Sequence, residues 1–386
     1  MKIAILTFHS QLNYGAVLQC WALQEAITKL GHDVKVLDRW LDPKNETLNG
    51  NRVSGIKSLI IRILNIVKMN GVFATGRRIH KTKRFISSNI NLTNYHFHTW
   101  KEAPKELDFD VVVVGSDQVW NSFGAKDPSV YLLKGAPPVR AISYAASLGM
   151  IEIPEHKQYL YAEGLKRFSR ISVREKSTIR LIEKFASLVD KVSDPVVLLD
   201  QKDWNKVSSE CVERRRKHLF CYFIAENIAE YYAAFSQFAK TTQADVEIYL
   251  SSTSEMRGLS CIDKLRSLMG GSVRLRIDGA PSDFLSSIRS ADWVLTDSFH
   301  AAMFSAIFNK NVRVMRPKSE VRIAMFDRIK ELSELLDEPF DFVSHDINSA
   351  LASFINGYGT CFSQKKLARL RNYSLDWLNR ALIQED

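Results

Sequence analysis

The feature that most constrains the fold is a short apolar run that ends in polar residues and is followed at once by an apolar helix. Residues 293–295 have the length and character of a buried strand, and 301–308 are typical of a buried helix. In open twisted α/β sheets, ligands bind where a strand passes into a helix, and the helix N-terminus attracts phosphate or carboxylate. The polar residues at 296–300 can form an anion site, but the stretch taken alone is explained better by capping through Asp297 or Ser298 with His300 as an ordinary first-turn residue.

The same order of strand and helix recurs along the chain and predicts an α/β fold built from two Rossmann-like lobes. The first lobe has expected strands at 2–8, 34–38, 110–114, 139–143, 171–173 and 196–199, and expected helices at 17–30 and 177–188. In the second lobe we expect strands at 219–224, 246–250, 273–277, 293–295 and 312–315, and helices at 229–240, 282–290 and 323–336. No G-x-G-x-x-G follows the first strand, so we infer no dinucleotide site. We place the lobes at 1–199 and 200–362, with a connection at 200–206 and a C-terminal helix within 363–386.

Two loops of the first lobe carry residues suited to a sugar. Gly115 follows the most apolar strand and permits close approach of the backbone, and three polar residues and an aromatic one come next, Ser116, Asp117, Gln118 and Trp120. Sugars have apolar ring faces and hydroxyls that need fixed hydrogen-bond partners, so this mixture favours an acceptor site. A capped turn with a core tryptophan is the simpler alternative. The second loop, Asn13, Tyr14 and Gly15, is either a plain turn or a set of backbone N–H groups for a ligand.

Arg174 lies at another expected junction of strand and helix, after the strand at 171–173. A guanidinium in that position can bind a carboxylate or phosphate through two parallel hydrogen bonds. The alternative is a local ion pair with Glu175, the next residue in the chain.

Composition favours a soluble, metal-free protein. Of 386 residues, 46% are hydrophobic and 25% charged, which is ordinary for a globular chain. The opening apolar run is too short for a signal peptide, and no run approaches the roughly 18 apolar residues of a membrane span, so we expect a cytoplasmic protein. The five cysteines form no C-x-x-C pair and the nine histidines no H-E-x-x-H motif, so we expect no metal site.

The positive charge is concentrated in one segment. Residues 52–84 hold nine lysines and arginines and no acid, out of a net charge of +10, so the rest of the chain is nearly neutral. We expect no nucleic-acid partner. Apolar residues within 56–67 recur at helical spacing, which predicts a cationic amphipathic helix. Either this helix packs on its own domain with a solvated basic face, or it contacts anionic lipid at the inner face of the membrane, or it holds a lipid-linked acceptor.

Several segments together resemble the polysaccharide pyruvyl transferase family. They occur in the same order over nearly the whole chain, at 1–9, 13–19, 112–121, 172–175, 296–300 and 371–378. The resemblance implies a glycosyltransferase-B-like fold with the active site in the cleft between the lobes. It also implies a reaction, the transfer of pyruvate from phosphoenolpyruvate to two hydroxyls of a sugar in a bacterial cell-surface or exopolysaccharide precursor. Phosphoenolpyruvate is then a co-substrate, and no cofactor is expected.

The resemblance also assigns roles to residues of this sequence. Arg174 and His300 match family residues that contact phosphoenolpyruvate, and the backbone of Ser298, Phe299 and His300 suits the donor's phosphate or carboxylate. His300 binds the anion as imidazolium or acts as the general acid. Asp117 and Asp297 are candidate bases or hydroxyl binders. Acceptor binding is assigned to the two first-lobe loops, Asn13, Tyr14, Gly15, Ser116, Asp117, Gln118 and Trp120.

Two other functions remain open. A glycosyltransferase that uses a nucleotide sugar would share the fold and an anion site in the second lobe, but it needs a pocket for base and ribose that the sequence does not indicate. A non-catalytic glycan-binding protein would keep the fold without a reaction. The joint presence of Arg174 and His300 argues against this last reading, because sugar binding alone needs no anion clamp.

Overall fold

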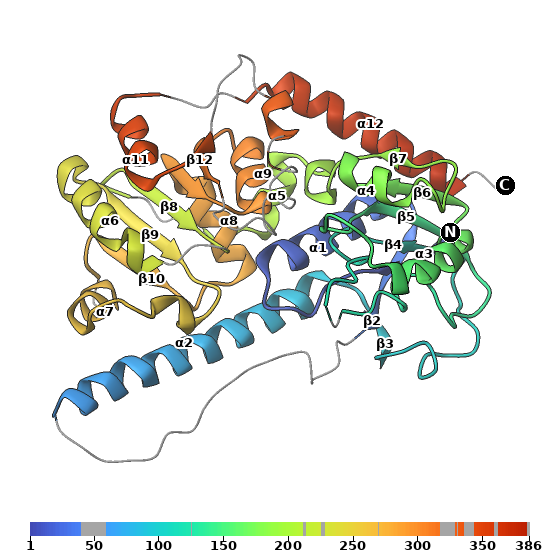
Figure 1. Ribbon diagram of the computed structural model, residues 1–386, viewed down its shortest axis with the longest axis horizontal. Helices are drawn as coiled ribbons and strands as arrows, with labels where there is room; N and C mark the ends of the chain where they lie inside the picture. The colour runs from blue at the N-terminus through green and yellow to red at the C-terminus, as the bar shows by residue number, and fades with distance from the viewer. Residues whose placement is uncertain are drawn as a thin grey trace.

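The computed structural model describes residues 1–39, 59–124, 126–210, 214–224, 228–268, 270–316, 329, 331–335, 343–358 and 362–383. Within these residues the chain forms two parallel sheets, each belonging to one lobe, with helices on both faces (Figure 1). The sheet orders are β3-β2-β1-β4-β5-β6-β7 and β10-β9-β8-β11-β12-β13. Each order reverses once, between β1 and β4 and between β8 and β11. In doubly wound sheets the ligand crevice opens at this reversal, beside the carboxyl ends of the strands.

The first sheet contains five of the six strands that the apolar runs predict, together with β3 and β7, which were not predicted. Its strands are β1 (Lys2–Leu6), β2 (Asp33–Arg39), β3 (Leu92–Phe97), β4 (Val111–Val114), β5 (Arg140–Ala146), β6 (Arg170–Val173) and β7 (Asp190–Lys191). The helices of this part of the chain are α1 (Tyr14–Lys29), α2 (Leu59–Asn89), α3 (Gln158–Gly164) and α4 (Lys176–Ile182). β4 is buried at every residue, as expected for a central parallel strand covered on both faces. The strand β3 was not predicted, because its sequence is polar.

The second sheet follows the same plan. Its strands are β8 (His218–Tyr222), β9 (Asp245–Tyr249), β10 (Val273–Arg276), β11 (Trp293–Thr296), β12 (Asn311–Met315) and β13 (Val343–Ser344). The accompanying helices are α6 (Ile228–Thr242), α7 (Cys261–Leu268), α8 (Pro281–Ser290), α9 (Phe299–Ile307) and α11 (Ile347–Ile355). The helix expected at 323–336 falls largely outside the described residues. Within that range the structure describes a 3-10 turn, η6 (Glu331–Leu335).

One apolar core fills the space between the two sheets. It combines alternate residues of β1, such as Ile3 and Ile5, with α1 from the first lobe and with α8, α9 and inward-facing residues of β8 and β11 from the second. The outer face of each sheet has its own core, beneath α3 for the first sheet and beneath α6 and α11 for the second. The lobes are therefore joined by buried apolar surface.

The connection between the lobes is packed into this core. Residues 196–199, predicted as a strand, instead form a 3-10 helix, η4 (Pro195–Leu198), because Asp194 caps its first turn and Pro195 starts it. The connection expected at 200–206 is the helix α5 (Gln201–Val207). Its Trp204 is fully buried, with ring centroids 5.0 Å from Trp21 of the first lobe and 4.7 Å from Phe304 of the second.

The helix α2 belongs to the first lobe in sequence but lies along the second lobe (Figure 1). Ala74 is part of the outer core of the second lobe, whereas Phe85 belongs to the central core. Two cations of the basic segment pair with acids of the second lobe, Arg77 with Asp278 at 3.2 Å and Lys81 with Asp283 at 3.1 Å. These contacts account for part of the basic charge without any external partner.

The C-terminal helix α12 (Gln364–Ile383) begins beside the second lobe and ends on the first, as Figure 1 shows. Arg140 of β5 donates hydrogen bonds to the carbonyl oxygens of Ala381 and Leu382, at 2.8 and 2.7 Å. The indole of Trp377 donates to Asp190 at 2.8 Å. This is the helix expected within 363–386. None of the helices in the described ranges is long and apolar enough to cross a membrane.

Candidate active site

The two sheet crevices meet where α1 of the first lobe faces α9 of the second. Gly15, in the first turn of α1, lies against the imidazole of His300, in the first turn of α9, so closely that a Cβ atom on Gly15 would overlap the ring. Gly15 is therefore required by contact between the lobes, which neither interpretation of its loop anticipated. The contact also sets two helix N-termini, both of which favour anions, at one place.

Asp194 is the centre of the site. Its carboxylate accepts a hydrogen bond from Arg174 Nη1 at 2.7 Å, and the same oxygen, Oδ2, lies 3.6 Å from His300 Nε2. The Ser116 hydroxyl lies 3.4 Å from this oxygen, and Tyr144 positions the preceding residue through a hydrogen bond to the Ser193 carbonyl. Asp194 is 1% exposed. The structure thus brings Arg174 and His300, from different lobes, onto one buried carboxylate.

Arg174 is held on several sides and keeps one open position. Its Nε lies 3.4 Å from Glu175, and its guanidinium carbon lies 5.1 Å from the centre of the Phe299 ring. Its Nη2 is 3.8 Å from Asp117, too far for a hydrogen bond. Among the described residues, Arg174 Nη2 and His300 Nε2 have no hydrogen-bond partner although both are buried. Two buried donors without a hydrogen-bond partner in one site can receive an anionic ligand.

The charges of the site stabilise one another. Burial alone would raise the pKa of Asp194, but His300 and Arg174 together hold that pKa well below its usual range. Burial likewise disfavours the charged form of Arg174, yet Asp194, Glu175 and Asp117 raise its pKa above the ordinary value. Asp194 is therefore a carboxylate and Arg174 a cation at neutral pH.

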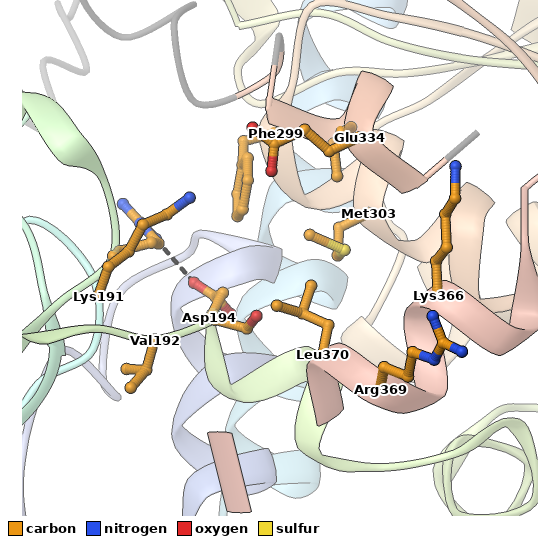
Figure 2. Close-up of a pocket in the computed structure, with 12 residues that line it drawn as sticks. Lys191, Val192, Asp194, Phe299, Met303, Glu334, Lys366, Arg369 and Leu370 are labelled. Atoms are coloured by element: carbon orange, nitrogen blue, oxygen red, sulfur yellow. Dashed lines mark hydrogen bonds and ion pairs between the residues drawn. The ribbon is translucent and has the colours of Figure 1, made fainter. Parts of the chain in front are cut away.

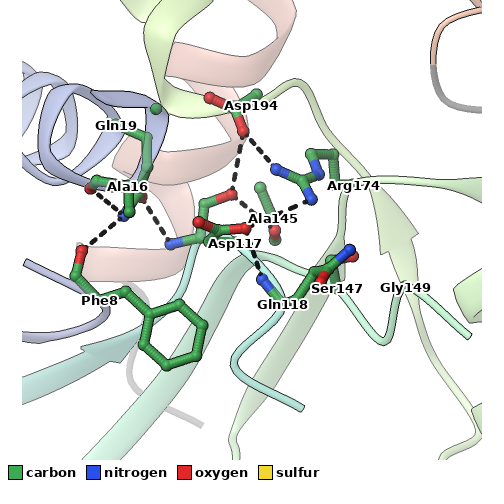
Figure 3. Close-up of polar contacts among 12 residues, drawn as sticks. Phe8, Ala16, Gln19, Asp117, Gln118, Ala145, Ser147, Gly149, Arg174 and Asp194 are labelled. Carbon is green, nitrogen blue, oxygen red and sulfur yellow. Dashed lines mark hydrogen bonds and ion pairs between the residues drawn. The ribbon is translucent and has the colours of Figure 1, made fainter. Parts of the chain in front are cut away.

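The loop after β4 is held by hydrogen bonds to Gln19 of α1 (Figure 3). The Gln19 amide donates to Thr7 Oγ1, Phe8 O and Ala16 O and accepts from the backbone of Ser116 at 3.3 Å. Ser116 in turn donates to the carbonyl of Ala145 at 2.9 Å. Ser116 is fully buried and serves this scaffold, so its side chain is not available to an acceptor.

The remaining candidates for acceptor binding include buried side chains and partly exposed ones. Trp120 is fully buried in the outer core of the first lobe and donates to the Tyr131 carbonyl at 3.2 Å, so it is not the exposed wall for a sugar that the sequence suggested. Tyr14 is also buried, stacked on Phe284 of the second lobe at 4.7 Å. Three candidates keep some exposure, Asn13, Asp117 and Gln118. Asn13 caps α1, and Asp117 accepts a hydrogen bond from the backbone of Gln118 at 2.8 Å.

The predicted donor residues of the second lobe lie at the start of α9. Ser298 is the N-cap and makes no side-chain hydrogen bond to the first turn, which leaves the helix N-terminus open to an anion. Phe299 lies against Arg174 as described above. Asp297 accepts a hydrogen bond from the backbone of Ile224 at 2.7 Å, which joins the ends of β11 and β8. The structure therefore gives Asp297 a positioning role within the second lobe.

A cavity of about 400 Å³ opens beside Asp194 (Figure 2). Its floor is apolar and includes Val192, Met303 and Leu370. Four cations and two acids also line it, Arg174, Lys191, Lys366, Arg369, Asp194 and Glu334. Because Asp194 pairs with Arg174 and Glu334 lies 3.8 Å from Lys176, the lining has an excess of positive charge. Such a cavity suits a small anion with an apolar part.

Asp194 was missed by sequence reasoning. The residues Asp194 and Pro195 precede four apolar residues, a pattern equally typical of a strand start and of a capped turn. The available signal was the sequence Asp194-Pro195, because an acidic residue followed by proline is typical of the cap and first turn of a helix.

Comparison with known proteins agrees with the architecture. The family model for polysaccharide pyruvyl transferase matches residues 13–319. No curated protein sequence matches the chain. Among solved structures, a protein assigned as a UDP-N-acetylglucosamine 2-epimerase from Listeria monocytogenes is similar with a TM-score of 0.54 and 10% identity, over 99% of this chain and 95% of that one.

A second solved structure, S. aureus MnaA with UDP, has a TM-score of 0.51 and 9% identity over 99% and 95% of the two chains. At such identities the similarity concerns the fold alone, the two-lobed arrangement of glycosyltransferase-B proteins. The family match, in contrast, covers most of the sequence and contains Arg174, Asp194 and His300. The chain belongs to the polysaccharide pyruvyl transferase family.

Proposed function

We propose that the protein transfers pyruvate from phosphoenolpyruvate to two hydroxyls of a sugar, forming a cyclic ketal and releasing phosphate. The observation that carries this proposal is a pair of buried donors beside Asp194, Arg174 Nη2 and His300 Nε2, which make no hydrogen bond to any residue that the structure describes. Phosphoenolpyruvate carries a carboxylate and a phosphate, and both need such donors. Its methylene needs an apolar surface, which Phe299 and Met303 supply in the adjoining cavity.

In the proposed reaction, a proton adds to the methylene carbon of the donor, and the first sugar hydroxyl bonds to the neighbouring carbon. The bond between that carbon and the phosphate oxygen then breaks, and the second hydroxyl takes its place. Of the two hydroxyl protons, one replaces the proton given to the new methyl group and the other leaves with phosphate. His300 is the proposed proton donor, because its Nε2 lies 3.6 Å from the Asp194 carboxylate and its ring lies at the junction of the lobes.

The acceptor side of the proposal rests on the first lobe. Asp117 is the candidate to receive a hydroxyl proton, since its carboxylate is partly exposed and lies 3.8 Å from Arg174. Gln118, the next residue, and Asn13, an exposed residue of the other first-lobe loop, can bind further hydroxyls. The proposed acceptor is a saccharide of a bacterial cell-surface or exopolysaccharide precursor, used on the cytoplasmic side of the membrane.

Donor binding provides the first test. Phosphoenolpyruvate should raise the melting temperature of the purified chain, whereas UDP at the same concentration should not. Arg174→Lys keeps a positive charge for Asp194 but loses the planar fork, so its affinity for phosphoenolpyruvate should fall about tenfold or more. Arg180→Lys, on the exposed part of α4, is the matched control and should behave as the wild type.

Substitution of His300 distinguishes a role in donor binding from a role in catalysis. If it donates the proton, His300→Gln should lower the rate of phosphate release more than it lowers donor affinity. Stabilisation by UDP without any response to phosphoenolpyruvate would contradict the proposal and favour a nucleotide-sugar enzyme. Absence of response to either ligand would favour a protein without donor chemistry.

A further inference from the structure

A second cavity lies in the second lobe, where α2 and α7 meet β10, the strand at the edge of the sheet. Figure 1 shows these three elements side by side. The cavity has a volume of about 480 Å³, within the usual range of about 300–1,000 Å³ for ligand sites. Among the described residues it shares no lining residue with the cavity beside Asp194. The proposed reaction therefore leaves this second cavity without a role.

The second cavity is lined by more positive than negative charge. Its charged side chains among the described residues are three arginines and one acid, Arg77, Arg274, Arg276 and Asp278. Asp278 lies between two of the arginines, because Arg77 Nε is 3.2 Å from one carboxylate oxygen and Arg276 Nε is 3.4 Å from the other. Arg276 also pairs with the buried Glu247 at 2.9 Å. Two carboxylates thus serve three guanidinium groups, and a positive charge remains at the cavity.

Two of the arginines keep donors for a ligand. Within the part of the chain that the structure describes, the ion pair of Arg77 is made by Nε, and Arg274 uses its own Nε to donate to the carbonyl oxygen of Gly271 at 3.4 Å. The terminal nitrogens of both side chains therefore remain for an anion, and the fork of a guanidinium matches the oxygens of a phosphate. Because Arg77 belongs to α2 and Arg274 to β10, a phosphate bound to both joins the helix to the edge of the second sheet.

The rest of the lining favours a sugar over a nucleotide base. None of the described lining residues is aromatic, so this wall offers no ring that could stack on a base. The Asp278 carboxylate has lone pairs beyond those that face its two arginines, and these can accept hydrogen bonds from hydroxyls. We propose that the second cavity binds a soluble sugar phosphate, with the phosphate on Arg77 and Arg274 and the hydroxyls at Asp278.

This ligand site is connected to the candidate active site by a short chain of contacts. Asp278 precedes Gly279, whose carbonyl oxygen accepts a hydrogen bond from the Tyr14 hydroxyl at 3.1 Å. Tyr14 is followed by Gly15, which lies against His300. A sugar phosphate that fixes the loop at Asp278 therefore favours the position of α1 in which Gly15 meets His300, and by linkage it activates donor binding. This activation rests on the proposed function, whereas the binding of the sugar phosphate does not.

The first experiment titrates glucose 6-phosphate into the full chain by calorimetry. The wild type should bind it, and the double variant Arg77→Gln/Arg274→Gln should bind it about tenfold or more weakly, because two charge-assisted contacts are lost. Glucose without the phosphate should not bind measurably. Lys83→Gln/Arg84→Gln is the matched control, since it removes two exposed cations of α2 that do not line the cavity. The site is overturned by a wild type that does not bind, by equal binding in the double variant, or by tighter binding of UDP than of glucose 6-phosphate.

The second experiment measures the affinity for phosphoenolpyruvate with and without saturating glucose 6-phosphate. In the wild type this affinity should rise about fivefold or more, and phosphoenolpyruvate should raise the affinity for glucose 6-phosphate by the same factor. Tyr14→Phe keeps the ring and loses the hydroxyl that reaches Gly279, so it should bind glucose 6-phosphate without this coupling. Coupling that persists in Tyr14→Phe would exclude this route between the two sites.

The remaining outcomes separate the sugar-phosphate site from the proposed function. An unchanged affinity for phosphoenolpyruvate in the wild type would overturn the activation, and displacement of glucose 6-phosphate by phosphoenolpyruvate would overturn the second site itself. If the proposed function is wrong, phosphoenolpyruvate does not bind and the activation fails with it. Glucose 6-phosphate binding would then still depend on Arg77 and Arg274.

Discussion

At the scale of single residues, the site is organised around one buried carboxylate, Asp194, which two basic side chains share. Arg174 and His300 reach Asp194 from different lobes, and each depends on it for its position. Removing one member of a buried pair leaves the other charged and unpaired, which costs far more than the net value of the pair. Substitutions here therefore change stability as well as activity.

Arg174→Ala should lower the free energy of unfolding by about 3–5 kcal/mol, because Asp194 stays buried and loses the cation that lies nearest to it. The double variant Arg174→Met/Asp194→Leu should recover much of that loss. The pKa of Asp194 is lowered on folding, so its stabilising contribution is present above its ordinary pKa and is lost as the pH falls through the folded value. Urea denaturation at neutral and acidic pH measures both effects. Equal stability of the wild type and Arg174→Ala at neutral pH would contradict this account.

Gly15→Ala tests the contact between the lobes with a single methyl group. The new Cβ would overlap His300, so the imidazole must move, and we expect phosphate release to fall about tenfold or more because a misplaced catalytic group loses its alignment. Gly76→Ala in α2 is the matched control, because a Cβ there meets nothing within 4 Å. In an exposed helical position that control should be neutral or stabilising by about 0.5–1 kcal/mol. Normal kinetics in Gly15→Ala would mean that His300 can move without loss.

At the scale of elements, α2 is the least expected part of the molecule. Arg78, which is 1% exposed, donates to the carbonyl oxygens of Leu250 and Ser251 in the second lobe and of Leu12 in the first, at 3.0, 2.7 and 2.5 Å. Its guanidinium also lies 4.5 Å from the centre of the Tyr14 ring. One arginine of the basic segment thus joins both lobes by hydrogen bonds.

Arg78→Ala should destabilise the protein by about 3–5 kcal/mol, because three carbonyl groups lose a charged donor in a buried place. Arg84→Ala removes the same charge from an exposed position of α2 and should change stability by less than about 0.5 kcal/mol. Thermal denaturation of both variants provides the measurement. Similar melting temperatures for the two would show that the basic segment does not join the lobes.

The elements predicted best are those determined by local sequence. Short apolar runs such as 111–114 form strands because both faces of a parallel sheet are covered. The strand predicted at 196–199 was wrong for a local reason. Its apolar residues fit a strand, and only the cap at Asp194 distinguishes the 3-10 helix that forms instead. The basic segment could not be interpreted locally, because Arg77 and Lys81 find their partners about two hundred residues later, at Asp278 and Asp283.

The candidate site was predictable in part for the same reason. Arg174 and His300 each follow a strand, and a parallel sheet brings the carboxyl ends of its strands to one edge. Trp120 also follows a strand, but its ring turns into the outer core, and side-chain direction after a loop cannot be deduced from spacing. Asp117 and Gln118 are half-buried and Ser116 is fully buried, a difference that arises only in the folded loop and cannot be seen in the sequence.

At the scale of the whole molecule, the two lobes share their largest core. Trp204 of the connecting helix α5 contacts aromatic rings of both lobes. Asp203, also in α5, forms an ion pair with Lys29 of α1. An interface of this kind resembles the interior of one domain rather than a contact between two.

The lobes should therefore unfold together. Calorimetry should give one transition, with the measured enthalpy equal to the van't Hoff enthalpy, in spite of the two sheets. Trp204→Ala should lower its midpoint and, by opening a cavity between the lobes, cost about 3–5 kcal/mol. Two separate transitions in the wild type would mean that the shared core does not couple the lobes.

The position of α2 also has a consequence for synthesis on the ribosome. This helix is synthesised early, but Ala74 packs in the outer core of the second lobe, and Arg77 and Lys81 pair with Asp278 and Asp283, which are synthesised about two hundred residues later. The helix α12 contacts the first lobe only through the last residues of the chain. The first lobe cannot complete its contacts while it is being made. We expect the nascent chain to expose α2 until most of the second lobe has been translated, so that a protein with two sheets acquires its native structure in a single late step and not one lobe at a time.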